Sequence, residues 1–252
     1  MKFAVLLFFS FAAMTCFGQK KDKPLTVYIY DSSWNSIVDI TKAIYLMEVI
    51  EENDTTFLAR NYQYSGPMIV QESYRDKDLT ITHGFFVWYD SEGRIDSSGY
   101  VFNEKKDSDW YEYNDDLEVV LKSTYYRGKL IESKTYNPKE KKNEKNDSSI
   151  LKDEKAAEFK GGLKGLGKFL SGEIVIPQRL SNLKKHGTVK ASFYIDTLGW
   201  IKDIYIVKSI EWSADKEVLR VINKMPQWVP AIQKGRKVKY SCIQPIIFPD
   251  EQ

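Results

Sequence analysis

Apolar and polar residues alternate along residues 187–195 in the pattern of a half-buried strand. The apolar set is Val189, Ala191, Phe193 and Ile195, and mostly polar side chains stand between its members. A strand with this period of two turns one face to a core and the other to water. Residues 197–199 then form a turn signal, and residues 200–210 continue as a second strand, so the pattern predicts a β-hairpin.

The segment after this hairpin changes to a helical period. Its apolar side chains recur with the spacing of one helix face, at Val218, Val221, Ile222 and Met225. Ser213 is placed to cap the start of this helix, and Pro226 ends it. After the polar stretch that follows, the pattern predicts a last strand from Val238 to Phe248.

Aromatic residues are most prominent between residues 60 and 140, where they repeat with a period of 24. The segment that begins at His83 aligns with the one that begins at Asp107, so that Phe86 corresponds to Trp110. Each unit reads as a strand, a polar turn and a second strand. Because a single hairpin is only marginally stable in water, such units are expected to stack into a long antiparallel sheet.

This repeat resembles the MORN-like, YwqK-type repeats of bacterial proteins over residues 60–136. The second copy departs from the pattern, because it has Leu117 where the first has the turn glycine Gly93. The resemblance implies a surface-recognition or spacer module without chemistry of its own.

Two segments divide the chain into domains. Residues 1–18 contain Lys2, an apolar run and a small residue at the end, so we expect a secretory signal peptide, with an uncleaved membrane anchor as the alternative. Residues 137–157 are mostly charged or polar and read as a linker. We therefore expect an antiparallel domain at residues 24–136 and an α+β domain at residues 158–252, each able to fold by itself.

The composition excludes several classes of function. Lysine and arginine number 37 against 35 aspartate and glutamate residues, so no basic footprint for nucleic acid is present. The stretch 161–170, GGLKGLGKFL, lacks the hydroxyl of a phosphate loop, because Phe169 follows its last lysine. The sequence offers no metal-ligand spacing and no Ser-His-Asp arrangement. We expect neither an enzyme nor a bound cofactor or metal, and Cys242 is expected to be a small buried hydrophobe.

Residues 158–248 resemble the C-terminal domain of TonB-type proteins, in the form common among Bacteroidetes. The residues that carry this resemblance are Gly161, Gly162, Pro177, Gly187, Gly199, Asp215, Leu219, Trp228, Pro230 and Gly235. The resemblance implies an α+β domain in which two helices pack on one face of a small antiparallel sheet. The segment 161–170 then corresponds to the first helix of that domain.

The resemblance also implies a binding mode, in which the domain adds a short peptide of an outer-membrane transporter as a strand beside its last strand. Here that strand is Lys237 to Phe248, and Glu173 to Ile176 would abut the peptide. The candidate partner-binding residues are Glu173, Ile174, Val238, Lys239, Tyr240, Ser241, Cys242 and Ile243. Pro245 independently indicates an edge strand, because it cannot donate to a ladder. Pro245 and the nearby lysines are equally suited to blunting that edge against unwanted pairing.

One departure from an energy transducer decides between two functions. Such a protein needs an uncleaved helix and a long proline-rich spacer, whereas the linker at residues 137–157 has a single proline, Pro138. We therefore expect an exported, periplasmic protein-protein interaction module whose partner is an outer-membrane TonB-dependent receptor or another envelope protein. The alternative is a TonB-type energy transducer anchored in the inner membrane by a retained leader.

Overall fold

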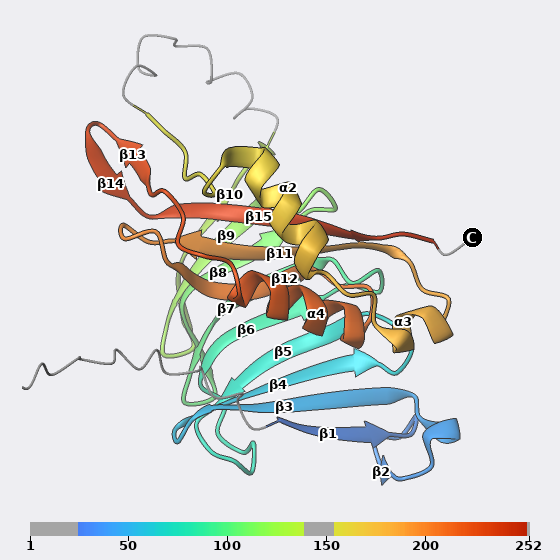
Figure 1. The fold of residues 1–252 in the computed structure, drawn as a ribbon. Coiled ribbons are helices and arrows are strands. Elements are labelled where there is room, and N and C mark those ends of the chain that lie inside the picture. The colour runs from blue at the N-terminus through green and yellow to red at the C-terminus, as the bar shows by residue number, and fades with distance from the viewer. Residues whose placement is uncertain (1–24, 139–153, 251–252) are drawn as a thin grey trace, which may run out of the picture.

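The computed structural model describes residues 25–138 and 154–250 (Figure 1). The expected leader and most of the expected linker lie outside the described residues. Within the two described ranges, no helix combines the length and the apolar character that crossing a membrane requires.

Residues 25–138 form one antiparallel sheet, in which each strand from β3 onward pairs with the next strand along the chain. The strands are β1 (Leu25–Tyr30), β2 (Ser36–Ile37), β3 (Tyr45–Asn53), β4 (Thr56–Gln63), β5 (Met68–Tyr74), β6 (Gly84–Tyr89), β7 (Ile95–Phe102), β8 (Lys105–Tyr113), β9 (Val119–Tyr126) and β10 (Lys129–Thr135), with the 3-10 helix η1 (Ile40–Lys42) between β2 and β3. This large sheet agrees with the antiparallel sheet that the aromatic pattern predicts.

The period of 24 residues is visible in the backbone of the large sheet. The β6–β7 and β8–β9 hairpins close with the same turn, because the amides of Asp90 and Asn114 each donate to the carbonyl oxygen four residues later, both at 2.9 Å. Gly93 and Leu117 occupy the same left-handed position in these turns, with φ of 74° and 65°. The two hairpins are therefore equivalent, and Leu117 adopts the conformation that the first copy gives to a glycine. The resemblance to MORN-like repeats stays a prediction.

Residues 154–250 form the predicted α+β arrangement. The small sheet has the order β12-β11-β15. Its strands are β11 (Gly187–Ile195), β12 (Ile201–Lys208) and β15 (Tyr240–Phe248); the helices are α2 (Gly162–Glu173), α3 (Gln178–Asn182) and α4 (Trp212–Asn223); and β13 (Ala231–Gln233) and β14 (Arg236–Val238) form a separate hairpin. Figure 1 shows α2 and α4 on one face of the small sheet.

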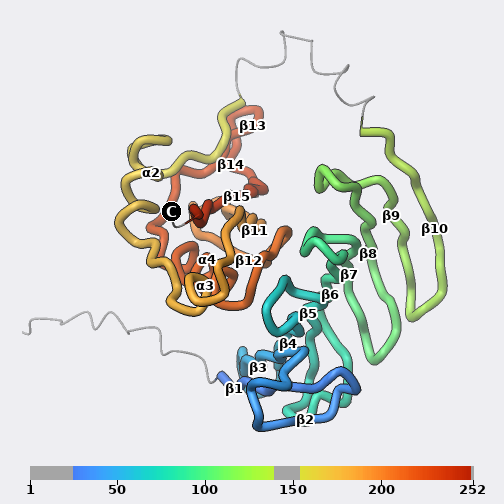
Figure 2. The backbone as a smooth tube through the Cα atoms, turned by 90° about the vertical axis from the view of Figure 1, so that its right-hand side faces the viewer, coloured from blue at the N-terminus to red at the C-terminus, as the bar shows by residue number. Residues whose placement is uncertain are grey.

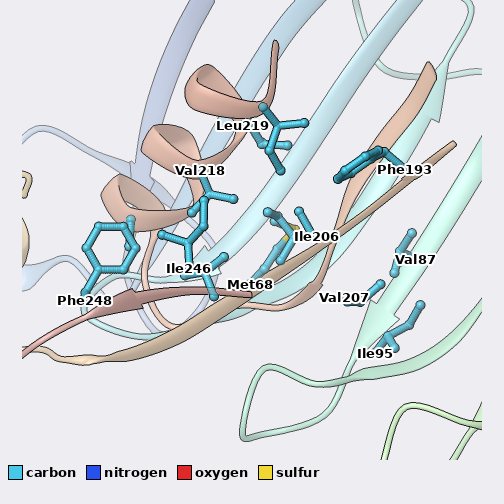
Figure 3. Packing of buried hydrophobic residues seen from close by; sticks show 14 of the residues in the cluster. Met68, Val87, Ile95, Phe193, Ile206, Val207, Val218, Leu219, Ile246 and Phe248 are labelled. Carbon is cyan, nitrogen blue, oxygen red and sulfur yellow. The ribbon is translucent and has the colours of Figure 1, made fainter. Parts of the chain in front are cut away.

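The alternation in β11 produces the helix-facing core of the small sheet. Val189, Ala191, Phe193 and Ile195 are all fully buried, as the period of two predicts. Val218 of α4 packs over the same cluster, together with Ile246 and Phe248 of β15 (Figure 3). Ile222 of α4 belongs to this cluster as well. Trp228 closes one end of this core, where its ring meets the edge of Phe193 with centroids 6.0 Å apart.

The large sheet covers the opposite face of the small sheet. Phe85 of β6 meets Tyr205 of β12 edge to face with ring centroids 5.2 Å apart, and the Tyr89 hydroxyl donates to the carbonyl oxygen of Ile206 at 2.8 Å. One continuous cluster of buried side chains includes Met68 and Val87 from the large sheet and Val207 from the small sheet (Figure 3). The halves share a core that the linker composition could not reveal, and the expectation that each half folds by itself stays a prediction.

Ser209, directly after β12, is the centre of the contact between the halves. Its amide donates to the carbonyl oxygen of Gly93 at 2.7 Å, and its hydroxyl accepts a hydrogen bond from the Met68 amide at 2.8 Å. The same hydroxyl donates to Oδ2 of Asp215 in α4 at 2.6 Å. Ser209 and Asp215 are completely buried. This relay ties β5 and the β6–β7 turn of the large sheet to the first turn of α4, and the Ser209 hydroxyl serves in it as both donor and acceptor. We call Gly93, Met68, Ser209 and Asp215 the Ser209 junction.

Charged side chains extend this contact toward β3 and β4. Arg179 of α3 pairs with the buried Glu211 at 2.6 Å and donates to the carbonyl oxygen of Tyr64. Trp212 donates from its indole nitrogen to Glu48 of β3 at 3.2 Å. Because buried charges are costly unless they are paired, these partners fix how the halves dock.

Two sequence expectations change in detail. The helix-capping side chain belongs to Glu211, which accepts from the amide of Ser213 at 2.7 Å, so α4 begins one residue before the expected cap. Ordered contacts of the second half begin inside the expected linker, where Lys155 bridges to Ile232 and Glu158 to Val229. These bridges explain why residues with no apolar periodicity are nevertheless in place: they pair through their backbone.

The docking of the halves predicts a clash at Gly93. A Cβ atom there would lie 2.5 Å from the carbonyl oxygen of Ser209, and the φ of 74° is unfavourable for any side chain. Gly235 has a similar φ of 72° but an open surrounding, so Gly235→Ala isolates the backbone cost of about 1 kcal/mol. We expect Gly93→Ala to lower the free energy of unfolding by at least about 1 kcal/mol more than that. Chemical denaturation measures both variants, and equal losses would contradict the docking described here.

The burial of Asp215 predicts a pH dependence of stability. Desolvation, with the charge of Glu211 added, holds the pKa of Asp215 well above the ordinary aspartate value of about 4, against the lowering effect of the Ser209 hydrogen bond. The folded state therefore retains a proton that the unfolded chain releases above about pH 4, and the contribution of this group to stability falls as pH rises from there toward its folded pKa.

We expect Asp215→Asn to remove this contribution, so that melting temperatures of the wild type fall relative to the variant between pH 4 and pH 8. Asp54→Asn, at an exposed turn, is the matched control. Parallel profiles of wild type and Asp215→Asn would show that Asp215 titrates normally.

Candidate functional site

The edge of β15 is the candidate site that the backbone itself provides. β15 pairs with β11 over nine residue pairs, from Gly187 with Phe248 to Ile195 with Tyr240. In the described part of the chain, no strand pairs with the other side of β15. An edge of this kind presents a row of backbone donors and acceptors to an incoming strand.

Pro245 indicates which amides of β15 point away from β11. It stands opposite Lys190 and has no N–H to give to the ladder, so an outward-pointing position costs the sheet nothing. Amide direction alternates with a period of two in an antiparallel pair, so Ser241, Ile243 and Ile247 share the orientation of Pro245. These positions supply the free donors of the edge.

The side chains of β15 divide between two faces. Ile246 and Phe248 are buried in the helix-facing core, with exposed fractions of 2% and 1%. Ile243 and Ile247 are exposed on the opposite face, at 51% and 69%. The edge is therefore anchored by one set of side chains and leaves the other set available for contact.

The predicted last strand is wrong at its start. Val238 belongs to β14, where it pairs with Ala231, and Lys239 lies between the two strands. Val238 pairs back on Ala231 because the chain reverses at Lys234 and Gly235, which both adopt positive φ and close the β13–β14 hairpin. Of the candidate residues, Tyr240, Ser241, Cys242 and Ile243 lie on the β15 edge strand, and Val238 does not.

Glu173 and Ile174 lie at the end of α2, beside α4. Glu173 contacts α4 through Lys224 at 3.1 Å and through its carbonyl oxygen, which accepts from Arg220. The following amide, of Val175, donates to Glu217 of the same helix at 2.7 Å. These contacts fix the end of α2 against α4, and the part of Glu173 and Ile174 in binding a peptide stays a prediction.

A cleft of about 670 Å³ lies beside β15, between the small and the large sheet. We call it the tyrosine cleft after the five tyrosines in its wall: Tyr100, Tyr111, Tyr113, Tyr194 and Tyr205. Ser241 and Ile243 of β15 line it as well. The sheets touch at β7 and β12, where Arg94 bridges to Lys208, and they diverge toward β15 and β9 (Figure 2). The sequence showed the richness in aromatic residues but not which of them would face β15.

The polar groups of the tyrosine cleft include two carboxylates. Asp203 pairs with Lys239 at 3.4 Å, and Asp109 pairs with Lys122 at 2.8 Å. The ammonium of Lys239 also lies 3.7 Å from the centre of the Tyr194 ring. Hydrogen bonds lower the pKa of Asp109, with Lys122 as the largest cause, so this carboxylate is ionised at neutral pH.

Cys242 is half-buried, and its thiol is poorly suited to act as a nucleophile. Burial raises the pKa of its thiol to about 11, so the reactive thiolate is scarce at neutral pH. Within residues 25–138 and 154–250, no group of three or more potential ligand side chains is placed to hold a metal ion. The chemistry that the site does offer is backbone pairing and aromatic contact.

Comparison with known proteins identifies one part of the chain. Residues 173–249 match the family described as the Gram-negative bacterial TonB protein C-terminal. The match covers less than half of the chain, from the last residue of α2 to the residue after β15. No curated protein matches the sequence. The matched family is a non-enzymatic protein-interaction domain of the Gram-negative envelope, and it contacts proteins such as outer-membrane receptors. The match over residues 173–249 therefore indicates a TonB-like role in outer-membrane transport or protein interaction.

Proposed function

We propose that this protein binds an extended segment of an envelope protein by adding it as a further strand along β15, in the periplasm. The observation that carries the proposal is the unpaired side of β15, in a segment that matches the TonB C-terminal family. Affinity then comes mainly from main-chain hydrogen bonds, which any extended segment can supply. An outer-membrane receptor is the class of partner that the match favours.

The proposed mode agrees with how β15 is held. Nine residue pairs to β11 and the buried anchors Ile246 and Phe248 make the strand rigid before a partner arrives. A rigid edge lowers the ordering cost on the protein's side, so that the cost of binding falls mainly on the peptide. The alternative of a membrane-anchored energy transducer depends on residues 1–18, which lie outside the described residues.

Proline substitutions in β15 test strand addition. Ile243→Pro removes an amide that points away from β11 and obstructs close approach, so we expect binding to fall at least about tenfold while the melting temperature changes little. Gln244→Pro removes an amide that bonds to β11 and should instead destabilise the fold by about 3 kcal/mol. Ile247→Ala, which keeps every amide, should bind normally.

The measurement is fluorescence polarisation of labelled synthetic peptides that cover the periplasm-facing segments of outer-membrane transporters, with thermal melting as the folding control. Unchanged binding by a folded Ile243→Pro variant would show that β15 is not the docking edge.

A further inference from the structure

The tyrosine cleft lies where one face of an added strand would point. Side chains of neighbouring antiparallel strands that stand opposite each other share a face of the sheet, with Cβ atoms about 5 Å apart. Ser241 and Ile243 line the cleft from β15, so a strand added beside them directs every second side chain toward the same space. The large sheet, at Asp109 and Tyr111 of β8, forms the opposite wall.

The walls of the cleft have the chemistry of a cation site. Tyrosine ring faces carry negative potential and attract ammonium and guanidinium groups. Asp109 and Asp203 add two carboxylates to these rings, and Lys239 is the only basic side chain among the lining residues that the structure describes. Lys122 pairs with Asp109 from outside the lining at 2.8 Å and balances its charge, so the ring faces are what favours a positively charged guest over an acidic one.

Lys239 shows what a bound cation would contact. Its ammonium lies 3.7 Å from the centre of the Tyr194 ring and 3.4 Å from Asp203, so an aromatic face and a carboxylate hold one cation between them. Both Lys239 and Asp203 are more than half exposed, so this pair is held weakly and an incoming side chain can share or replace it. On the opposite wall the Tyr111 hydroxyl donates to Asp109 at 3.4 Å, and Lys122 pairs with the same carboxylate at 2.8 Å.

We infer that the tyrosine cleft selects partners by receiving a lysine or arginine side chain of the added strand. This inference rests on the proposed strand addition and gives it a specificity that backbone pairing lacks. The large sheet then forms part of the binding site rather than a spacer, because it supplies Asp109 and most of the tyrosines. The preferred partner is an extended peptide with a basic residue at a cleft-facing position.

A display library of random nine-residue peptides, selected on the full chain, tests this inference. Selected peptides are synthesised and titrated against the wild type, against Ile243→Pro and against the double variant Asp109→Asn with Asp203→Asn. Asparagine suits position 203, whose φ is 53°, so the double variant should fold. The matched control for charge is Asp54→Asn with Asp78→Asn, at exposed positions away from the cleft.

We expect lysine or arginine to be enriched at a position of the selected peptides. The cleft double variant should bind these peptides about tenfold more weakly than the control double variant does. Replacing the basic residue of a peptide by leucine should weaken binding to the wild type and abolish the difference between the two double variants. That non-additivity is what a direct contact predicts.

The outcomes separate the two proposals. Selected peptides that Ile243→Pro weakens but that show no preference for basic residues would overturn cation recognition and leave strand addition standing. Basic peptides that depend on Asp109 and Asp203 but not on Ile243 would overturn strand addition. Peptides that depend on neither would overturn both, and enrichment of acidic residues would overturn cation recognition directly.

Discussion

The Ser209 junction determines how the two sheets of this protein face each other. One buried hydroxyl accepts from the Met68 amide and donates to Asp215, while the Ser209 amide holds the Gly93 turn. Leaving any of these buried groups without a partner costs about 1–3 kcal/mol, so the halves have little freedom to separate at this end. The linker is not all that joins the two halves, because the large sheet also packs against the small sheet through the residues that follow β12.

Because the sheets are held at one end, they enclose a space at the other. The contact between β7 and β12 closes the wedge, and the divergence toward β15 opens it (Figure 2). The same geometry keeps the large sheet away from the outer side of β15, so that this strand has no partner among the described residues. Pro245 and the lysines near it suit an edge that must avoid pairing with arbitrary strands, and a selective cleft beside the edge serves the same end.

Local patterns predicted most elements well. The period of two in β11 gave a fully buried row from Val189 to Ile195, and the helical period gave Val218, Val221 and Ile222 at zero exposure in α4. The offset of 24 residues placed equivalent turns at Gly93 and Leu117, even though leucine is a poor turn residue at positive φ. Predictions were weaker at the ends of the elements. Glu211 rather than Ser213 caps α4, and Val238 pairs in a hairpin instead of extending β15.

The sequence by itself determined most of the elements and the likeness of residues 158–248 to a TonB C-terminal domain, of which the family match covers residues 173–249, because these depend on spacing along the chain. Only the tertiary structure decided that the halves share a core, that Glu173 packs against α4 and that tyrosines from β7 and β8 face β15. Such contacts join residues far apart in the chain, separated by 51 positions for Glu173 and Lys224 and by 141 for Met68 and Ser209. No periodicity records them, because they depend on how finished sheets dock and on which buried polar groups must find partners.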